Sequence, residues 1–264
     1  MNFKKLLAIT LTVLMAVTMF VGCADKSDLE YVQGKGKLTI GMTLFAPMDY
    51  LDDNGELVGF EVDFGKAVCE KLGVEPEFVE INWDAKETEL NAKNIDCVWN
   101  GMTITEERKE NMSISNPYMI NKQVVVAKKE NADKYKDNAK AALVVAEAGS
   151  AGEELATGND FFKDAEFTAV DSMAKALMDV SAGTSDIAIV DYIAALGSIG
   201  EGTDFENLVV VETESFNQEE YGIAFRKGSD LTAKVNEIIS ELVADGTLAE
   251  IAKKYNLGDV LSAK

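Results

Sequence analysis

Short β-branched segments alternate with longer helical segments along this chain, and the alternation starts again near its middle. The first series predicts strands over residues 38–41, 77–81 and 97–99, with helices over 62–72 and 85–92. Such alternation favours an α/β sandwich with mainly parallel strands. The pattern restarts at residues 142–146 and reaches a strand at 187–190, with helices near Glu153 and Met173 between them. The sequence therefore predicts two sheets.

The two sheets are expected to lie in two lobes that the chain connects twice. The 264 residues are enough for each lobe to bury its own core. Residues 118–123 and 214–220 are the expected crossings, so residues 37–117 and 221–264 would form the first lobe and 124–213 the second. A double crossing makes a hinge, and the cleft between the lobes is then the expected binding site.

Residues 1–22 have the pattern of a secretory signal peptide. Two lysines precede an apolar run over residues 6–21, which is shorter than the ~20 residues that a spanning helix prefers. The small residue Gly22, followed by Cys23 and a polar stretch, resembles the cleavage site of bacterial lipoproteins, although Phe20 stands where leucine is usual. We expect a lipidated Cys23 at the start of a tether over residues 23–36. An ordinary signal peptide is the alternative.

The chain carries 46 acidic and 25 basic residues, a net charge of −21. This charge excludes nucleic acid as a partner and repels anionic lipid. We therefore expect a monomeric body on the outer face of the cytoplasmic membrane, held there by the N-terminal lipid alone.

The chain has no histidine, and Cys69 and Cys97 form no CxxC pair. The usual parts of zinc sites and of Ser-His or Cys-His catalysis are thus missing, and no metal or cofactor is expected. The two cysteines are expected to be small apolar core residues, with a disulfide between them as the alternative.

Arg108 occupies an unfavourable place in a predicted helix. Thr105 is the expected N-cap and Glu106 and Glu107 follow it, so Arg108 falls at the third helical position. There the helix dipole disfavours a cation by roughly 0.3 to 1 kcal/mol. A guanidinium beside unpaired amide groups is suited to bind a carboxylate. We predict an anion clamp, with a solvated arginine paired to a neighbouring glutamate as the alternative.

A second anion cradle is predicted at Gly149, Ser150 and Ala151, between a strand and a helix. Small residues at such a turn allow backbone N–H groups to approach a carboxylate. An ordinary strand-to-helix turn would have the same pattern.

Asp191 directly follows the apolar residues 187–190 and corresponds to Asn100 at the end of a strand in the first lobe. Ligands of open α/β sheets bind at the carboxyl ends of strands, so these two ends should face one cleft. Asp191 is either a carboxylate for a ligand ammonium or the N-cap of the following helix, and the two roles are compatible.

Several segments together resemble the polar amino-acid-binding proteins of ATP-driven importers. The segments are 37–41, 59–63, 94–96, 101–108, 115–118, 149–153, 185–191 and 221–225. The resemblance implies a periplasmic-binding-protein-like fold, with two α/β lobes, a two-strand hinge and the ligand in the interlobe cleft. It also implies that the chain binds a free α-amino acid outside the cell and delivers it to the membrane permease of an ABC transporter.

The resemblance also assigns roles to individual residues. It implies that Arg108, a backbone N–H at Thr103 and the cradle hold the α-carboxylate, that Asp191 holds the α-amine, and that two aromatic residues flank the ligand side chain. These aromatic residues are Phe45 and Trp83. Gly101 is a further expected ligand-binding residue.

The positions that vary with specificity carry Met42, Asn100, Glu147 and Val190, and Tyr118 is a further candidate for the cleft wall. An acid at position 147, beside a carboxylate cradle, is unfavourable unless a positive group arrives. We therefore hypothesise a cationic ligand such as lysine, arginine or ornithine, with a polar neutral one such as glutamine next.

Two other functions remain open from the sequence. The same fold includes dehydratases that act on cyclohexadienyl acids, for which Glu147 is the one candidate acid-base group. A sensor that presents its closed form to a receptor is the other. Because Asp191 keeps the α-amine site, we favour a binding protein that performs no chemistry.

Overall fold

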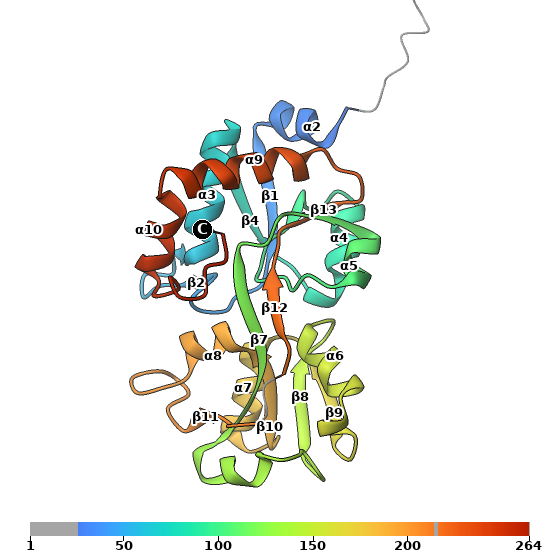
Figure 1. Cartoon of the computed structure of the whole chain (residues 1–264), viewed down its shortest axis with the longest axis vertical. Coiled ribbons are helices and arrows are strands. Elements are labelled where there is room, and N and C mark those ends of the chain that lie inside the picture. The colour runs from blue at the N-terminus through green and yellow to red at the C-terminus, as the bar shows by residue number, and fades with distance from the viewer. Residues whose placement is uncertain (1–25, 214–215, 264) are drawn as a thin grey trace, which may run out of the picture.

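The computed structural model describes residues 26–213 and 216–263, which form two α/β lobes, one above the other in Figure 1. The predicted signal peptide and Cys23 fall outside the described residues, as do positions 214 and 215 of the predicted second crossing. Within the described part of the chain, no helix has the length and apolar character needed to cross a membrane. The predicted fold class is confirmed.

The upper lobe contains a five-stranded sheet with the order β4-β1-β5-β13-β6. The strands are β1 (Lys37–Met42), β4 (Glu75–Glu80), β5 (Cys97–Val98), β6 (Met112–Ile114) and β13 (Ala224–Arg226). β1 runs parallel to β4 and β5, whereas β13 is antiparallel to β5 and β6. The chain therefore returns to this lobe after building the other one.

Helices cover both faces of the upper sheet and a small hairpin lies beside it (Figure 1). The helices are α2 (Asp28–Lys35), α3 (Phe60–Leu72), α4 (Lys86–Asn91), α5 (Glu106–Asn111), α9 (Leu231–Ala244) and α10 (Thr247–Lys254), with the 3-10 turn η2 (Trp83–Ala85) and the hairpin β2 (Tyr50–Leu51) and β3 (Leu57–Val58). α3 begins after Gly59, ends at Gly73 and buries Phe60, Phe64 and Val68 in the core. Cys69 and Cys97 are buried free thiols.

The lower lobe contains the sheet β11-β7-β10-β8-β9. The strands are β7 (Met119–Lys128), β8 (Leu143–Glu147), β9 (Glu166–Val170), β10 (Ile187–Asp191) and β11 (Leu208–Val210); the helices are α6 (Ala151–Gly158), α7 (Met173–Ala182) and α8 (Tyr192–Ser198), with the 3-10 turns η3 (Lys129–Tyr135) and η4 (Asp160–Phe162). β8 is parallel to β9 and β10, and β7 is antiparallel to β10 and β11. The carboxyl ends of β8 and β10 point toward the upper lobe (Figure 1).

Two neighbouring strands pass between the lobes. β7 begins at the crossing and continues without a break into the lower sheet, and β12 (Gln218–Tyr221) returns antiparallel to its first half. In this register Glu219 lies opposite Asn121. The crossing is thus a short two-stranded ribbon, which positions polar side chains directly beside the cleft.

The expected tether over residues 23–36 contains a packed helix instead. Ser27 caps α2 by accepting a hydrogen bond from the amide of Glu30 at 3.2 Å, and Gly36 ends it in the left-handed conformation. Val32 is fully buried in the upper-lobe core. The carboxylate of Asp28 pairs with Arg226 at 3.0 Å. Residues 28–35 therefore form a helix of the upper lobe, which corrects the prediction that they belong to a tether.

Candidate ligand-binding site

A small cavity lies between the lobes where the strand ends face each other. Its lining residues are Trp83, Asn100, Gly101, Thr103 and Arg108 from the upper lobe, and Gln123, Glu147, Ser150, Ala151, Met173, Ile189, Val190 and Asp191 from β7 and the lower lobe. Its volume is about 20 Å³, the space of a single water. The lobes are therefore closed upon each other, and any larger solute requires them to separate.

Arg108 reaches across the cleft from the upper lobe. Thr105 accepts a hydrogen bond from the amide of Arg108 at 3.1 Å, so it caps α5 and places Arg108 at the third helical position. The guanidinium is almost fully buried and donates to the carbonyl of Thr103 at 2.7 Å. It also donates to the carbonyl of Gly149 at 3.3 Å and to the carboxylate of Glu154 at 3.1 Å, both in the lower lobe. Arg108 thus forms part of the contact between the lobes.

The predicted cradle lies where β8 turns into α6. Gly149 has a φ of 68°, which favours glycine, and Ser150 caps α6 by accepting from the amide of Glu153 at 3.2 Å. The amide of Gly149 donates to the carboxylate of Glu153 at 2.6 Å, and the amide of Ser150 to the carbonyl of Glu147 at 3.2 Å. An anion bound at this turn would use amides further into the helix or displace Glu153.

Asp191 is the last residue of β10 and lines the cavity. It occupies the N-cap position of α8, but its carboxylate makes no capping hydrogen bond. The carboxylate instead accepts from the hydroxyl of Tyr221 at 2.8 Å and from the side-chain amide of Gln123. Burial raises the pKa of Asp191, and these two hydrogen bonds oppose the rise. The position is that of a cap, while the side chain faces the cleft.

Glu147 ends β8 and is a second acid in the same cavity. Its side chain is 2% exposed, and its Oε1 atom has no hydrogen-bond partner among the described residues. Burial, followed by the nearby charge of Asp191, raises the pKa of Glu147 to about 8. A buried carboxylate oxygen without a hydrogen-bond partner is costly, and a positive charge placed beside it would reduce that cost.

Glu219 is a third acid beside the cleft, and the sequence analysis missed it. Its Oε1 atom accepts hydrogen bonds from Thr103 at 3.0 Å, Asn121 at 2.5 Å and Gln123 at 2.7 Å. Burial, followed by the charge of Asp191, raises the pKa of Glu219 to about 7. These contacts link the crossing strands β7 and β12 to the upper lobe.

Lys86 was also missed, although it lies at the first position of α4. Its ammonium donates to the carbonyl of Gly149 at 2.9 Å and to that of Trp83 at 3.3 Å, and it lies over the Trp83 ring. Burial, followed by the charge of Arg108, lowers the pKa of Lys86 to about 8. A lysine that starts a short helix gives no sequence signal of a contact with a distant lobe.

Three side chains expected in the binding site do not line the cavity, namely Phe45, Tyr118 and Met42. Trp83 does line the cavity, but Phe45 lies in the core with its ring beside Gly101. Tyr118 is fully buried and donates to Glu61. Met42 is buried at the end of β1.

Asn100 reaches the cavity, but its side chain is already engaged with Thr43. It accepts from the amide of Thr43 at 2.9 Å and donates to its hydroxyl at 2.6 Å. Moreover, β5 ends at Val98, so Asn100 lies two residues beyond the strand end where it was expected. Of the expected specificity positions, Asn100, Glu147 and Val190 line the cavity and Met42 does not.

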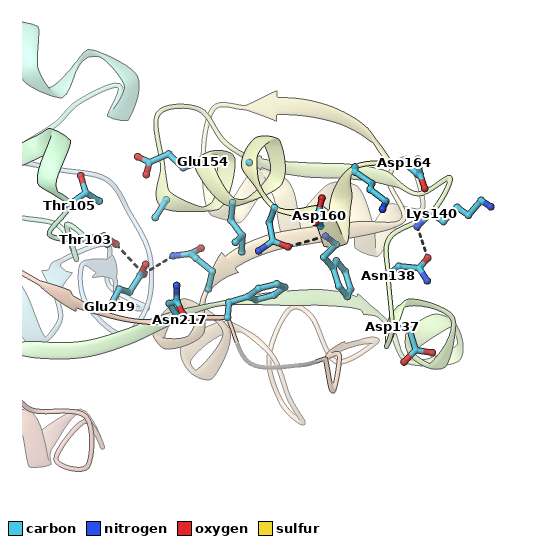
Figure 2. Close-up of a pocket in the computed structure, with 18 residues that line it drawn as sticks. Thr103, Thr105, Asp137, Asn138, Lys140, Glu154, Asp160, Asp164, Asn217 and Glu219 are labelled. Atoms are coloured by element: carbon cyan, nitrogen blue, oxygen red, sulfur yellow. Dashed lines mark hydrogen bonds between the residues drawn. The ribbon is translucent and has the colours of Figure 1, made fainter.

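A wider groove of about 890 Å³ adjoins the cavity along α6 (Figure 2). Three residues line both spaces, namely Thr103, Gln123 and Ala151. Figure 2 shows the pair Thr103 and Glu219 at the inner end of this groove, with Lys140 and Asp164 at its outer end. The groove brings solvent to the edge of the closed cavity.

Proteins of known function are similar to this chain over almost its whole length. L-cystine-binding protein TcyJ of Escherichia coli (strain K12) is 33% identical over 258 residues, which cover 96% of this chain and 94% of the relative. Arginine-binding extracellular protein ArtP of Bacillus subtilis (strain 168) is 29% identical over 254 residues, covering 94% and 97%.

Solved structures are similar as well. Tv2483 bound to L-arginine superposes with a TM-score of 0.81 at 28% identity, covering 89% of this chain and 97% of that chain. The ancestral amino acid-binding protein AncCDT-1, a precursor of cyclohexadienyl dehydratase, gives a TM-score of 0.76 at 32% identity and covers 87% and 99%. The relatives thus share the two-lobed fold.

The family expected from the sequence is confirmed. The model of one protein family matches residues 38–258, which include both lobes and every residue that lines the cavity. With this match and the relatives above, the chain belongs to the bacterial extracellular solute-binding proteins, family 3.

Proposed function

We propose that this protein binds an α-amino acid in the cavity between its lobes and delivers it to the permease of an ABC transporter. The observation that carries the proposal is that Arg108 from the upper lobe and Asp191 from the lower lobe line one cavity. The two side chains offer opposite charges, so a zwitterion between them would stabilise the closed form.

The proposed ligand carries a second positive charge. Glu147 lies in the same cavity as Asp191, and its Oε1 atom has no hydrogen-bond partner among the described residues. A ligand ammonium or guanidinium would provide that partner and lower the cost of a buried carboxylate. Two of the relatives are named for arginine and L-cystine, and both amino acids carry a second basic group. Lysine, arginine and ornithine are the first candidates, and glutamine is the next. L-cystine tests whether a second amine is enough to bind.

The proposed location is the outer face of the cytoplasmic membrane, with Cys23 lipidated. The family is described as extracellular, which supports export. Replacing Cys23 with serine should release the protein from the membrane fraction into the medium, whereas an unchanged distribution would contradict a lipid anchor.

We propose that the protein is a binding protein rather than an enzyme. The relatives with sequence similarity reported above are named for binding. A dehydratase would need an acid-base group in the cavity, and Glu147, with a pKa of about 8, is the candidate. Asp191 argues against this alternative because an α-amine partner has no use in a site for a cyclohexadienyl acid. Turnover of such an acid by the purified protein would overturn the proposal.

The test is thermal unfolding of the protein against a panel of L- and D-amino acids. A ligand at one hundred times its dissociation constant stabilises by about 2.7 kcal/mol, which raises the unfolding temperature by several degrees. A rise with lysine, arginine or ornithine supports both the function and the proposed role of Glu147. A rise confined to amino acids without a second basic group keeps the function and removes that role, and no rise with any amino acid contradicts the function.

A further inference from the structure

Gly197 in α8 makes an unusually close contact with the loop that follows β1. A Cβ atom placed on Gly197 would lie 2.3 Å from the carbonyl oxygen of Ala46, 2.5 Å from the carbonyl carbon of Ala46 and 2.7 Å from the Cδ atom of Pro47. These separations are far shorter than van der Waals contact. Two of these three atoms belong to the backbone, so no side-chain rotation would relieve the clash.

The two sides of this contact belong to different lobes. α8 lies at the edge of the lower lobe that faces the upper lobe (Figure 1), whereas Ala46 precedes the hairpin β2–β3 of the upper lobe. The lobes are connected through β7 and the segment that contains β12. A hinge motion at these strands would carry Gly197 away from Ala46, so the contact is a property of the closed arrangement.

A second glycine makes a comparable approach on the α6 side of the lower lobe. A Cβ atom on Gly149 would lie 2.9 Å from the Oδ1 atom of Asp84 and 3.0 Å from its Cα atom. Gly149 has a left-handed φ of 68°, so a substitution there also strains its own turn. Gly197 lies inside a helix, where alanine is preferred over glycine. Among the described glycines, Gly197 is therefore the position where alanine tests the contact between the lobes without straining its own backbone turn.

We propose that Gly197 sets how far the lobes close, because its missing side chain lets α8 rest directly on the Ala46–Pro47 backbone. It is a positioning residue for binding: it does not line the cavity, yet it controls whether Arg108 and Asp191 approach the same ligand. The inference rests on the proposed function and adds a steric determinant of affinity outside the ligand site.

The experiment compares Gly197→Ala with Gly34→Ala and the unmodified protein. Gly34 lies inside α2, and a Cβ atom there would have only the Lys26 ammonium, 3.8 Å away, within contact distance. L-arginine, L-lysine and L-cystine are titrated calorimetrically, and the unfolding temperature of each ligand-free variant is measured. Small-angle scattering then gives the radius of gyration of each variant at saturating ligand.

We expect Gly197→Ala to weaken binding by at least about tenfold, because the methyl group holds the lobes apart at this edge. Its ligand-free unfolding temperature should equal or exceed that of the unmodified protein, and its liganded radius of gyration should be larger. Gly34→Ala should bind normally. Binding by Gly197→Ala within threefold of the unmodified protein, or a fall of several degrees in its ligand-free unfolding temperature, would overturn the inference. Absence of binding by the unmodified protein to every amino acid of the thermal-unfolding panel would refute the proposed function itself, and this inference with it.

Discussion

The ammonium of Lys86 lies 2.9 Å from the carbonyl oxygen of Gly149, and this hydrogen bond joins the two lobes directly. The same carbonyl oxygen accepts a second hydrogen bond from Arg108 at 3.3 Å. One carbonyl oxygen of the lower lobe therefore accepts hydrogen bonds from two cationic side chains of the upper lobe. A bond between lobes can stabilise the closed form without touching the ligand.

Replacing Lys86 with methionine should weaken ligand binding by about 0.5 to 3 kcal/mol, mainly through faster dissociation, because a charge-assisted hydrogen bond of the closed form is lost. Stopped-flow measurement of association and dissociation rates checks this. The exposed Lys66 of α3 offers a matched control, Lys66→Met, which should leave both rates unchanged. An unaltered dissociation rate in Lys86→Met would contradict the role of this contact.

Replacing Arg108 with alanine should weaken binding by roughly 2 to 5 kcal/mol, because the ligand carboxylate would lose its partner in a closed, desolvated cleft. Arg108→Lys keeps the charge but loses the planar fork, so its affinity should lie between that of the unmodified protein and that of Arg108→Ala. Isothermal titration of the three proteins with one ligand measures the series. A loss below threefold in Arg108→Ala would contradict the clamp.

Replacing Glu147 with glutamine should reduce the preference for cationic ligands and should raise the stability of the ligand-free protein above pH 8. Glutamine removes the proposed partner of the ligand cation, so the preference for lysine or arginine over glutamine should disappear. The pKa of Glu147 is raised from 4.5 to about 8, so folding stability falls as pH rises through that interval. Above pH 8 the variant should therefore unfold at a higher temperature than the unmodified protein. An unchanged ranking of bound amino acids in competition titrations would exclude Glu147 as the selector.

The same raised pKa predicts that binding of a cationic ligand depends on pH. Below a pKa of about 8 the Glu147 carboxyl is largely protonated, and a bound cation would expel that proton. The dissociation constant for L-lysine should then rise by up to about tenfold for each pH unit from pH 8 down to pH 6. Calorimetry in two buffers with different ionisation enthalpies measures the released proton directly.

Two other groups near the cleft titrate in this range, namely Glu219 with a pKa of about 7 and Lys86 with a pKa of about 8. Glu147→Gln separates their contribution from that of Glu147. If the variant keeps the full pH dependence, the proton comes from another group.

Replacing Val32 with alanine should lower the free energy of unfolding by about 1 to 3 kcal/mol, because α2 is part of the upper-lobe core and the change leaves a cavity. Gln33→Ala on the exposed side of the same helix is the control and should stay within about 0.5 kcal/mol. Urea unfolding at constant m-value measures both. Equal stability of the two variants would mean that residues 28–35 act as a tether after all.

Local sequence patterns predicted what depends on neighbouring residues. The strand at residues 38–41 corresponds to β1, and the cap at Thr105 places Arg108 as expected, because both follow from residue spacing alone. Helix α2 was missed although Ser27, Glu30 and Gly36 give its start and end signals, because the polar residues after Cys23 were interpreted as a tether.

The parts that could not be predicted depend on contacts between distant segments. Glu219 meets Thr103 and Gln123 only because β12 pairs with β7 in one particular register. Phe45 was expected to flank the ligand side chain, but its ring packs against Gly101 and does not line the cavity. Register and side-chain packing across 100 residues leave no local pattern in the sequence.

The place of β13 in the upper sheet has a consequence for the order of folding. β13 lies between β5 and β6, so the sheet has a gap until residues 224–226 have been synthesised. The strands β7 to β11 of the lower sheet, in contrast, come from one continuous stretch, residues 119–210. Because contacts between neighbouring segments form faster than contacts between distant ones, we expect the lower lobe to fold before the upper lobe is complete. A chain that ends before residue 224 therefore lacks the strand that joins β5 to β6, although it contains every residue that lines the cavity.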